Sequence, residues 1–141
     1  MWSTLSSIFP YAIGYTMPML MAALGGLYSE RSGVTNLGLE GLMVIGYFFS
    51  ALAVKLTEAT LGANALGLGL LVGTVAGALF SLLHAFASIN LKADQVISGT
   101  AINMIAGALT VYLARTITGS GNVRIMMGII RKNIPVLSKI P

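Results

Sequence analysis

Four long apolar stretches, separated by short polar breaks, dominate the pattern of the chain. They cover residues 8–28, 37–54, 65–87 and 96–117. A helix needs roughly 20 apolar residues to cross the hydrocarbon core of a bilayer, and each stretch has about that length. The pattern therefore predicts an all-α, polytopic membrane protein. We expect about four transmembrane helices in a single transmembrane domain over residues 1–141, with residues 118–141 as a basic tail.

The start of the second stretch is irregular. Glycines stand at positions 33, 38 and 41, and glycine weakens a helix. We therefore expect the second helix to be interrupted near Asn36–Glu40. A membrane tolerates an interrupted helix only where it is buried in protein or lines a wet cavity.

Four side chains around this interruption are candidates for a solute pathway. Asn36, Glu40, Met43 and Tyr47 are spaced by four, three and four residues, so they share one face if the helix is continuous. A carboxylate in such a place is costly and usually faces a cavity or a partner. The alternative is structural: Glu40 caps the helix or pairs with Arg31 near the interface.

The third stretch carries small residues at every fourth position, including Gly69, Gly73 and Gly77. Such a stripe lets two helices pack backbone to backbone, and a sliding surface is the functional alternative. His84, near the end of this stretch, is expected to be a packed or hydrogen-bonded helix-end residue rather than a proton carrier.

The polar loop after the third stretch contains Lys92, Asp94 and Gln95. Together with Arg31, these residues could contact a cytoplasmic partner. The alternative is a plain turn in which Asp94 caps the fourth helix. Within that helix, Asn103 could either hydrogen-bond to another helix or face a substrate route.

Composition supports the membrane class and excludes several others. Only 9% of residues are charged and 56% are hydrophobic, whereas soluble domains carry about 25% charged residues. With no cysteine and one histidine, we expect no metal site and no cofactor. The net charge of +4 is dispersed, which argues against nucleic-acid binding. We find no phosphate-binding loop and no hydrolase motif, so an enzyme is not expected.

Charge also predicts orientation. No Lys or Arg precedes the first stretch and Arg31 follows it, which favours an outside N-terminus and an inside Arg31. Lys92 then lies inside, whereas Lys55 and the basic tail lie outside, against the positive-inside tendency. The N-terminus lacks the basic region and cleavage site of a signal peptide, so we expect the first helix to be retained.

Three segments carry a family resemblance. They are residues 24–43 (LGGLYSERSGVTNLGLEGLM), 93–103 (ADQVISGTAIN) and 134–141 (IPVLSKIP). They resemble the permease family of bacterial ABC importers for branched-chain amino acids, simple sugars and nucleosides. The nucleoside and simple-sugar branch is the most similar one.

The resemblance implies a multi-pass protein of the bacterial inner membrane that forms a solute pathway. Expected partners are an ABC ATPase subunit, an extracytoplasmic solute-binding protein, a second permease subunit and membrane lipid. Asn36 and Glu40 match motif positions near the route. Family members are about twice as long, so the chain is expected to be the N-terminal half of a permease and to lack the loop that docks on the ATPase.

Two other functions stay open at the level of sequence. One is a small helical membrane scaffold or assembly subunit that packs through its glycine stripe. The other is a pore formed by self-association, with rings of Glu40 at its mouth. The residues alone do not separate nucleoside, sugar and amino acid as the solute.

Overall fold

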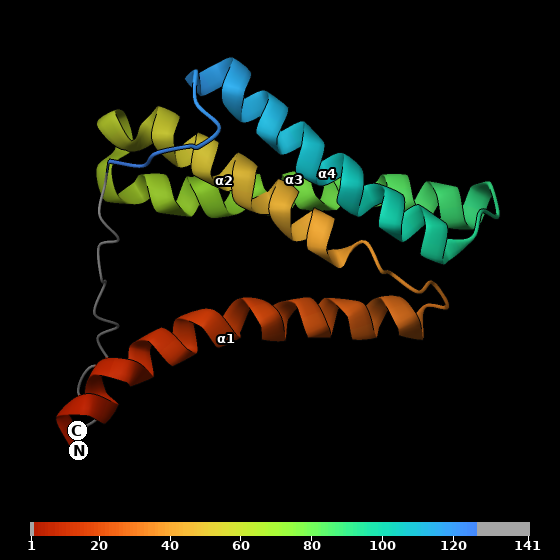
Figure 1. The fold of residues 1–141 in the computed structure, drawn as a ribbon, viewed down its shortest axis with the longest axis horizontal. Coiled ribbons are helices and arrows are strands. Elements are labelled where there is room, and N and C mark those ends of the chain that lie inside the picture. The colour runs from red at the N-terminus through yellow and green to blue at the C-terminus, as the bar shows by residue number, and fades with distance from the viewer. Residues whose placement is uncertain (1, 127–141) are drawn as a thin grey trace.

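The computed structural model describes residues 2–126, which form four long helices and two short helical turns (Figure 1). In chain order, the elements are α1 (Trp2–Arg31), α2 (Leu39–Leu61), the 3₁₀ turn η1 (Gly62–Asn64), α3 (Ala65–Ala85), the π-helical turn η2 (Phe86–Asn90) and α4 (Gln95–Thr118). Residues 2–126 contain no strand. The prediction of an all-α membrane protein with about four helices is confirmed. The motif at 134–141 and most of the basic tail lie outside the described residues.

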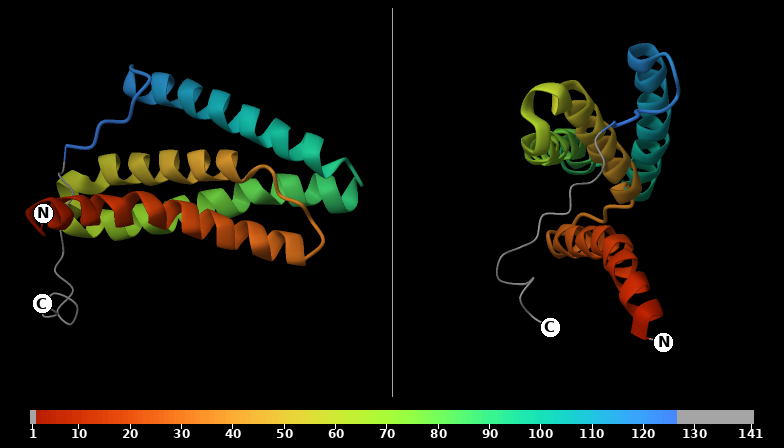
Figure 2. Two further views of the ribbon diagram at one scale, coloured as in Figure 1. Left: turned by 60° about the horizontal axis from the view of Figure 1, so that its bottom comes forward. Right: turned by 90° about the vertical axis from the view of Figure 1, so that its left-hand side faces the viewer.

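The four helices account for three stretches that are long and apolar enough to cross a membrane: Ser7–Arg31, Leu39–Asn90 and Gln95–Thr118. The middle stretch is one helical run of 52 residues. It folds back on itself at η1, so that α2 and α3 lie side by side and antiparallel (Figures 1 and 2).

The second helix differs in its limits from the apolar stretch that predicts it. The interruption lies before the helix, because residues 34–36 have no regular secondary structure and α2 begins at Leu39. The helix then continues through Lys55 and Glu58 to Leu61, beyond the predicted end at residue 54. Lys and Glu are good helix formers, so their polarity marks the rim of the apolar band rather than the end of the helix. Gly62, with φ of 52°, ends it instead.

Helix α2 is the centre of the packed unit and contacts both α3 and α4. Its buried positions recur every three or four residues, the spacing that places side chains on one face of a helix. They are Gly41, Ile45, Phe48, Ala51 and Val54. A similar stripe on α4 is buried: Gly99, Ile102, Ala106, Thr110 and Ala114.

The close contact between α2 and α3 depends on two glycines of α3, Gly69 and Gly73, which have no side chain. A Cβ atom built on Gly73 would lie 2.7 Å from the Gly46 carbonyl oxygen and 2.9 Å from the Ser50 Cβ. One built on Gly69 would lie 2.5 Å from a Val54 methyl group. The two backbones therefore approach as closely as small residues allow.

Helix α1 lies apart from this unit (Figures 1 and 2). None of its described side chains is buried, although they are mostly apolar. It contains both Pro10 and Pro18 and is bent along its length, as expected where proline removes a backbone hydrogen bond.

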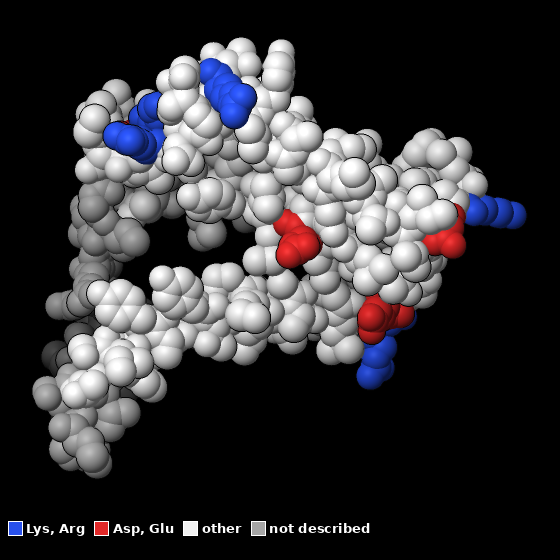
Figure 3. Space-filling model, in the orientation of Figure 1, with Lys and Arg blue, Asp and Glu red and all other residues white. Residues whose placement is uncertain are grey.

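Lys and Arg side chains lie at the two ends of the molecule, and on the face shown in Figure 3 an acidic patch lies between these ends. One end carries the C-terminus of α1 and the connection from α3 to α4. The other carries the turn between α2 and α3 and the C-terminus of α4. Arg31 and Lys92 thus lie at one end of the molecule and Lys55 lies at the other. Helices that cross a membrane in alternating directions would place these residues on opposite sides in the same way.

Candidate functional site

The segment between α1 and α2, residues 33–38, forms a loop that is fixed by side chains from two other helices. We call it the tethered loop. It starts where α1 ends, because Gly33 adopts a φ of 85°, in the left-handed region that favours glycine. The Val34 N–H then donates to the Ser29 carbonyl oxygen at 3.2 Å, and the Ser29 hydroxyl donates to the Val34 carbonyl oxygen at 2.7 Å.

Gln95, the first residue of α4, binds the backbone of the tethered loop in two places. Its Oε1 accepts a hydrogen bond from the Thr35 N–H at 2.7 Å. Its Nε2 donates to the Gly33 carbonyl oxygen at 3.4 Å. A single side-chain amide therefore satisfies one donor and one acceptor of a loop backbone that lies outside any helix.

His84, near the end of α3, binds the same loop from another side. The ring is buried, with 3% of its surface exposed. Its Nε2 lies 3.3 Å from the Thr35 carbonyl oxygen, and its Nδ1 lies 3.0 Å from the Ser98 hydroxyl of α4. Because a carbonyl oxygen only accepts, Nε2 carries a proton; in the neutral ring, Nδ1 then accepts from Ser98. His84 thus joins α3, α4 and the tethered loop.

Asn103 of α4 binds the end of the loop and the start of α2 together. Its Nδ2 donates to the Leu37 carbonyl oxygen at 3.0 Å, and its Oδ1 accepts from the Gly41 N–H at 2.7 Å. The first N–H groups of a helix have no partner within the helix, so Asn103 caps α2 from a neighbouring helix. Gly41 permits this approach, since a Cβ there would lie 2.9 Å from the Asn103 Cα.

Asn36 lies in the tethered loop and not on α2. Its Oδ1 accepts from the Gly38 N–H at 2.9 Å, a local turn that asparagine commonly forms. The face shared by Asn36, Glu40, Met43 and Tyr47 therefore does not exist as a continuous helical face. Only the last three of these residues are on α2, where all three are exposed.

A large apolar groove lies between α1, α2 and α3. It encloses about 870 Å³, and both Met43 and Tyr47 line it together with Gly73 and Gly77 of the glycine stripe. Asn36, Glu40 and Asn103 are not among its lining residues. The structure therefore divides the five candidate pathway residues. Met43 and Tyr47 line the groove, whereas Asn36 and Asn103 form hydrogen bonds in and around the tethered loop. Glu40 does neither of these.

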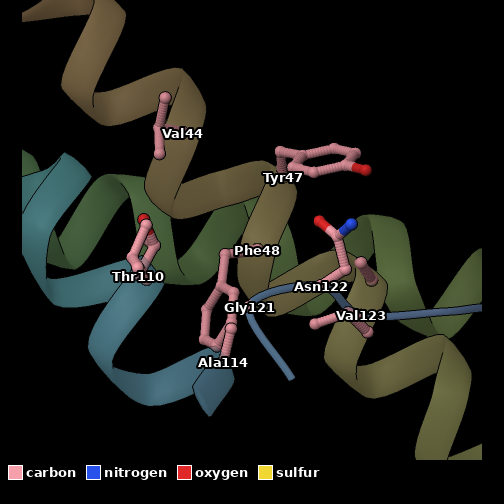
Figure 4. A pocket seen from close by; sticks show the side chains of 10 residues that line it. Val44, Tyr47, Phe48, Thr110, Ala114, Gly121, Asn122 and Val123 are labelled. Carbon is pink, nitrogen blue, oxygen red and sulfur yellow. The ribbon is translucent and has the colours of Figure 1, made fainter. Parts of the chain in front are cut away.

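A second, smaller pocket of about 160 Å³ lies on the other side of α2 (Figure 4). Its walls come from α2, from α4 and from the segment after α4, including Phe48, Thr110 and Asn122. Tyr47 lines both this pocket and the groove. The small pocket carries no charged side chain among its lining residues.

The remaining candidate residues lie at the end of the molecule where α3 turns into α4. Asp94 caps α4, since its Oδ1 accepts from the Val96 N–H at 2.8 Å and from the Ile97 N–H at 3.1 Å. Arg31 and Lys92 are exposed there. Gln95, grouped with them from the sequence, instead binds the tethered loop. The described residues contain no group of three or more side chains suited to a metal ion.

Sequence reasoning found most of these residues but not their partners. His84 and Gln95 were assigned to a helix end and to a loop, and neither could be linked to Thr35, which is 49 and 60 residues away in the chain. A usable signal did exist: the two motifs at 24–43 and 93–103 each contain polar residues at otherwise apolar positions, and the structure brings these two motifs together.

Comparison with known proteins places the chain among transport proteins. Residues 8–129 match the family described as branched-chain amino acid transport system / permease component. The guanosine ABC transporter permease protein NupQ of Bacillus subtilis is 47% identical over 138 residues, which is 97% of this chain and 43% of NupQ. The nucleoside ABC transporter permease protein NupC of Lactococcus lactis is 41% identical over 99% of this chain and 44% of NupC.

A third relative, the putative glucose ABC transporter permease protein TsgC13 of Haloferax volcanii, is 43% identical over 67% of this chain and 27% of its own length. No solved structure matches significantly. The chain spans less than half the length of these curated relatives. The family match covers most of the chain and includes the motifs at 24–43 and 93–103. The protein therefore belongs to the permease component family of branched-chain amino acid transport systems.

Proposed function

We propose that this chain supplies membrane-spanning helices of the permease of an ABC-type importer, and that the imported solutes are nucleosides. The observation that carries the proposal is the 41–47% identity to two nucleoside permeases over nearly the whole chain.

In this function the chain forms part of a solute pathway and catalyses no reaction. A separate ABC ATPase subunit would supply the energy, an extracytoplasmic solute-binding protein would deliver the solute, and a second permease subunit would complete the pathway. The end that carries Arg31 and Lys92 would face the cytoplasm, as the charge around the first helix favours. The chain would then correspond to the N-terminal half of a permease.

The solute route would pass along the exposed side of α2. Met43 and Tyr47 line the large groove, and Glu40 is exposed in the first turn of the same helix. Phenol and carboxylate groups can hydrogen-bond to the hydroxyl groups of a ribose. Asn36 and Asn103 would shape the route by fixing the loop at its edge.

Uptake of radiolabelled nucleosides by cells that carry the permease with its ATPase and binding protein tests the proposal. We expect uptake that requires ATP hydrolysis and is blocked by excess unlabelled guanosine but not by glucose. Competition by glucose alone would assign the protein to sugar transport. Ion conductance by the purified protein in planar bilayers would favour the self-associated pore.

The Glu40→Gln variant tests the route itself. We expect it to reduce nucleoside uptake at least about fivefold while membrane insertion stays unchanged, because the charge is lost but the shape is kept. Met104→Leu, at an exposed position of α4, is the matched control. Unchanged uptake by Glu40→Gln would assign Glu40 to packing or capping, and loss of membrane insertion would make its role structural.

A further inference from the structure

We propose that His84 is a positioning residue that fastens the tethered loop to the connection between α3 and α4, so that the two move as one unit. The proposal deepens the proposed function, because the tethered loop lies directly before the pathway face of α2. Three observations carry it: the contacts of the ring, its burial, and the unusual backbone that follows it.

The contacts of His84 are directional. One ring nitrogen reaches the Thr35 carbonyl oxygen and the other the Ser98 hydroxyl. The ring is 3% exposed, so water cannot readily replace either partner if it is lost. Both ring nitrogens are thus satisfied, and loss of either contact would leave a buried polar atom without its partner.

The backbone after His84 departs from ordinary helix geometry. Residues Phe86–Asn90 form a π-helical turn, which is rare and frequent at functional sites. Inside it, the Ser88 hydroxyl is buried and has no hydrogen-bond partner in the described part of the protein. Lys92 follows with φ of 52°, in the left-handed region that a lysine rarely adopts. Such irregularities cluster at ligand sites and switch regions, where the stored strain can be part of the mechanism.

The connection and the loop are also joined on the other side. Gln95 begins α4 immediately after the connection and binds Thr35 and Gly33. His84 precedes the irregular turn and Gln95 follows it, so both ends of the connection hold the same loop residue. A displacement of the connection would therefore be carried to the loop.

Two substitutions separate fastening from packing. In His84→Gln the side-chain amide reaches about as far as Nε2 and can still donate to the Thr35 carbonyl oxygen. In His84→Asn it reaches only about as far as Nδ1 and keeps the Ser98 contact. Hydrogen–deuterium exchange of the full protein in lipid nanodiscs, followed on peptides that cover residues 33–41, reports the release of the loop.

We expect His84→Asn to speed exchange of residues 33–41 about five- to tenfold, the effect of one lost hydrogen bond, and His84→Gln to change it less than about twofold. Thr100→Ala is the matched control, since the Thr100 hydroxyl binds only carbonyl oxygens of its own helix. Equal exchange in the two His84 variants, whether both slow or both fast, would overturn the proposal in favour of packing.

A further pair tests whether the connection and the loop move together. Lys92→Gly relieves the left-handed backbone, and Lys92→Ala removes the charge without relieving it. We expect Lys92→Gly, but not Lys92→Ala, to slow exchange of residues 33–41 about twofold or more, and this effect to vanish in the His84→Asn background. An effect of equal size in that background would show that His84 does not carry the coupling.

Transport gives a second readout. Fastening of the loop should affect the turnover of nucleoside uptake more than the apparent KM, so we expect His84→Asn to lower the maximal rate at least about threefold and His84→Gln to restore most of it. Absence of nucleoside uptake in the unaltered protein would refute the proposed function, whereas the exchange measurement would still decide the role of His84.

Discussion

The two places where α2 meets its neighbours are built in opposite ways. Against α3, the contact is apolar and close: Gly69 and Gly73 face the α2 backbone and the short side chains of Ser50 and Val54. Against α4 and the tethered loop, polar side chains such as Asn103 bind specific backbone groups. The first contact sets how closely two helices approach, and the second sets where the tethered loop lies relative to α4.

The largest expected effect comes from filling the glycine contact. Gly73→Ala would place a Cβ 2.7 Å from the Gly46 carbonyl oxygen, which forces the two helices apart and should lower the free energy of unfolding by about 3 kcal/mol. Thermal stability of the detergent-solubilised protein measures this. Gly77→Ala is the control, because its Cβ would lie 3.7 Å from the Leu42 carbonyl oxygen. Equal losses in both variants would contradict a glycine contact centred on Gly73.

Next in size is the cap that Asn103 provides. Asn103→Ala leaves the Gly41 N–H and the Leu37 carbonyl oxygen without their partner and should cost about 2 kcal/mol. Asn103→Asp keeps an acceptor for the Gly41 N–H and should cost less. Chemical unfolding monitored by circular dichroism compares them. If Asn103→Ala proves as stable as the parent protein, the polar contact is not part of what holds α4 against α2.

Gln95 should contribute less, because its contacts to the loop are exposed. Gln95→Ala removes the acceptor of the Thr35 N–H and should cost about 1 kcal/mol, with faster exchange confined to residues 33–38. Gln95→Glu retains that acceptor and should preserve most of the protection. Faster exchange spread over α2 as well would mean that the loop and the helix open together, which would weaken the distinction drawn between the two contacts.

The smallest effect is expected at Asp94, which caps α4 but does not touch the loop. Asp94→Ala should lower stability by about 0.5 kcal/mol, at the low end for an N-cap in an exposed position, and Asp94→Asn should be neutral. The exchange rates of residues 33–38 should not change in either variant. A change there would show that the start of α4 acts on the loop through more than Gln95.

The long helices could be predicted from the sequence because the bilayer demands uninterrupted apolar stretches. Their ends could not, since Lys55 and Glu58 are polar and yet helical. The irregular segment could be predicted from its glycines. Whether Asn36 shares a helical face with Glu40 depended on a continuous helix, and α2 begins only at Leu39. Periodicity identifies which side of a helix is apolar, but it carries no information on which distant residue a polar side chain will meet.

The candidate site shows the same limit more sharply. The sequence placed Asn103 inside a helix, His84 at a helix end and Gln95 in a polar loop. Each of them binds backbone, and backbone groups are present at every position of the chain. A side chain that binds another side chain leaves a complementary pair in the sequence. One that binds the backbone of Thr35 leaves no trace there, so only the three-dimensional arrangement could reveal the tethered loop.

The short connection between α2 and α3 constrains how the protein is made. Three residues, Gly62–Asn64, separate the two helices, and three extended residues reach only about 10 Å, far less than the roughly 30 Å of a hydrocarbon core. Helix α3 therefore cannot wait in the cytosol while α2 crosses alone. We therefore expect α2 and α3 to enter the membrane together, as one helical hairpin.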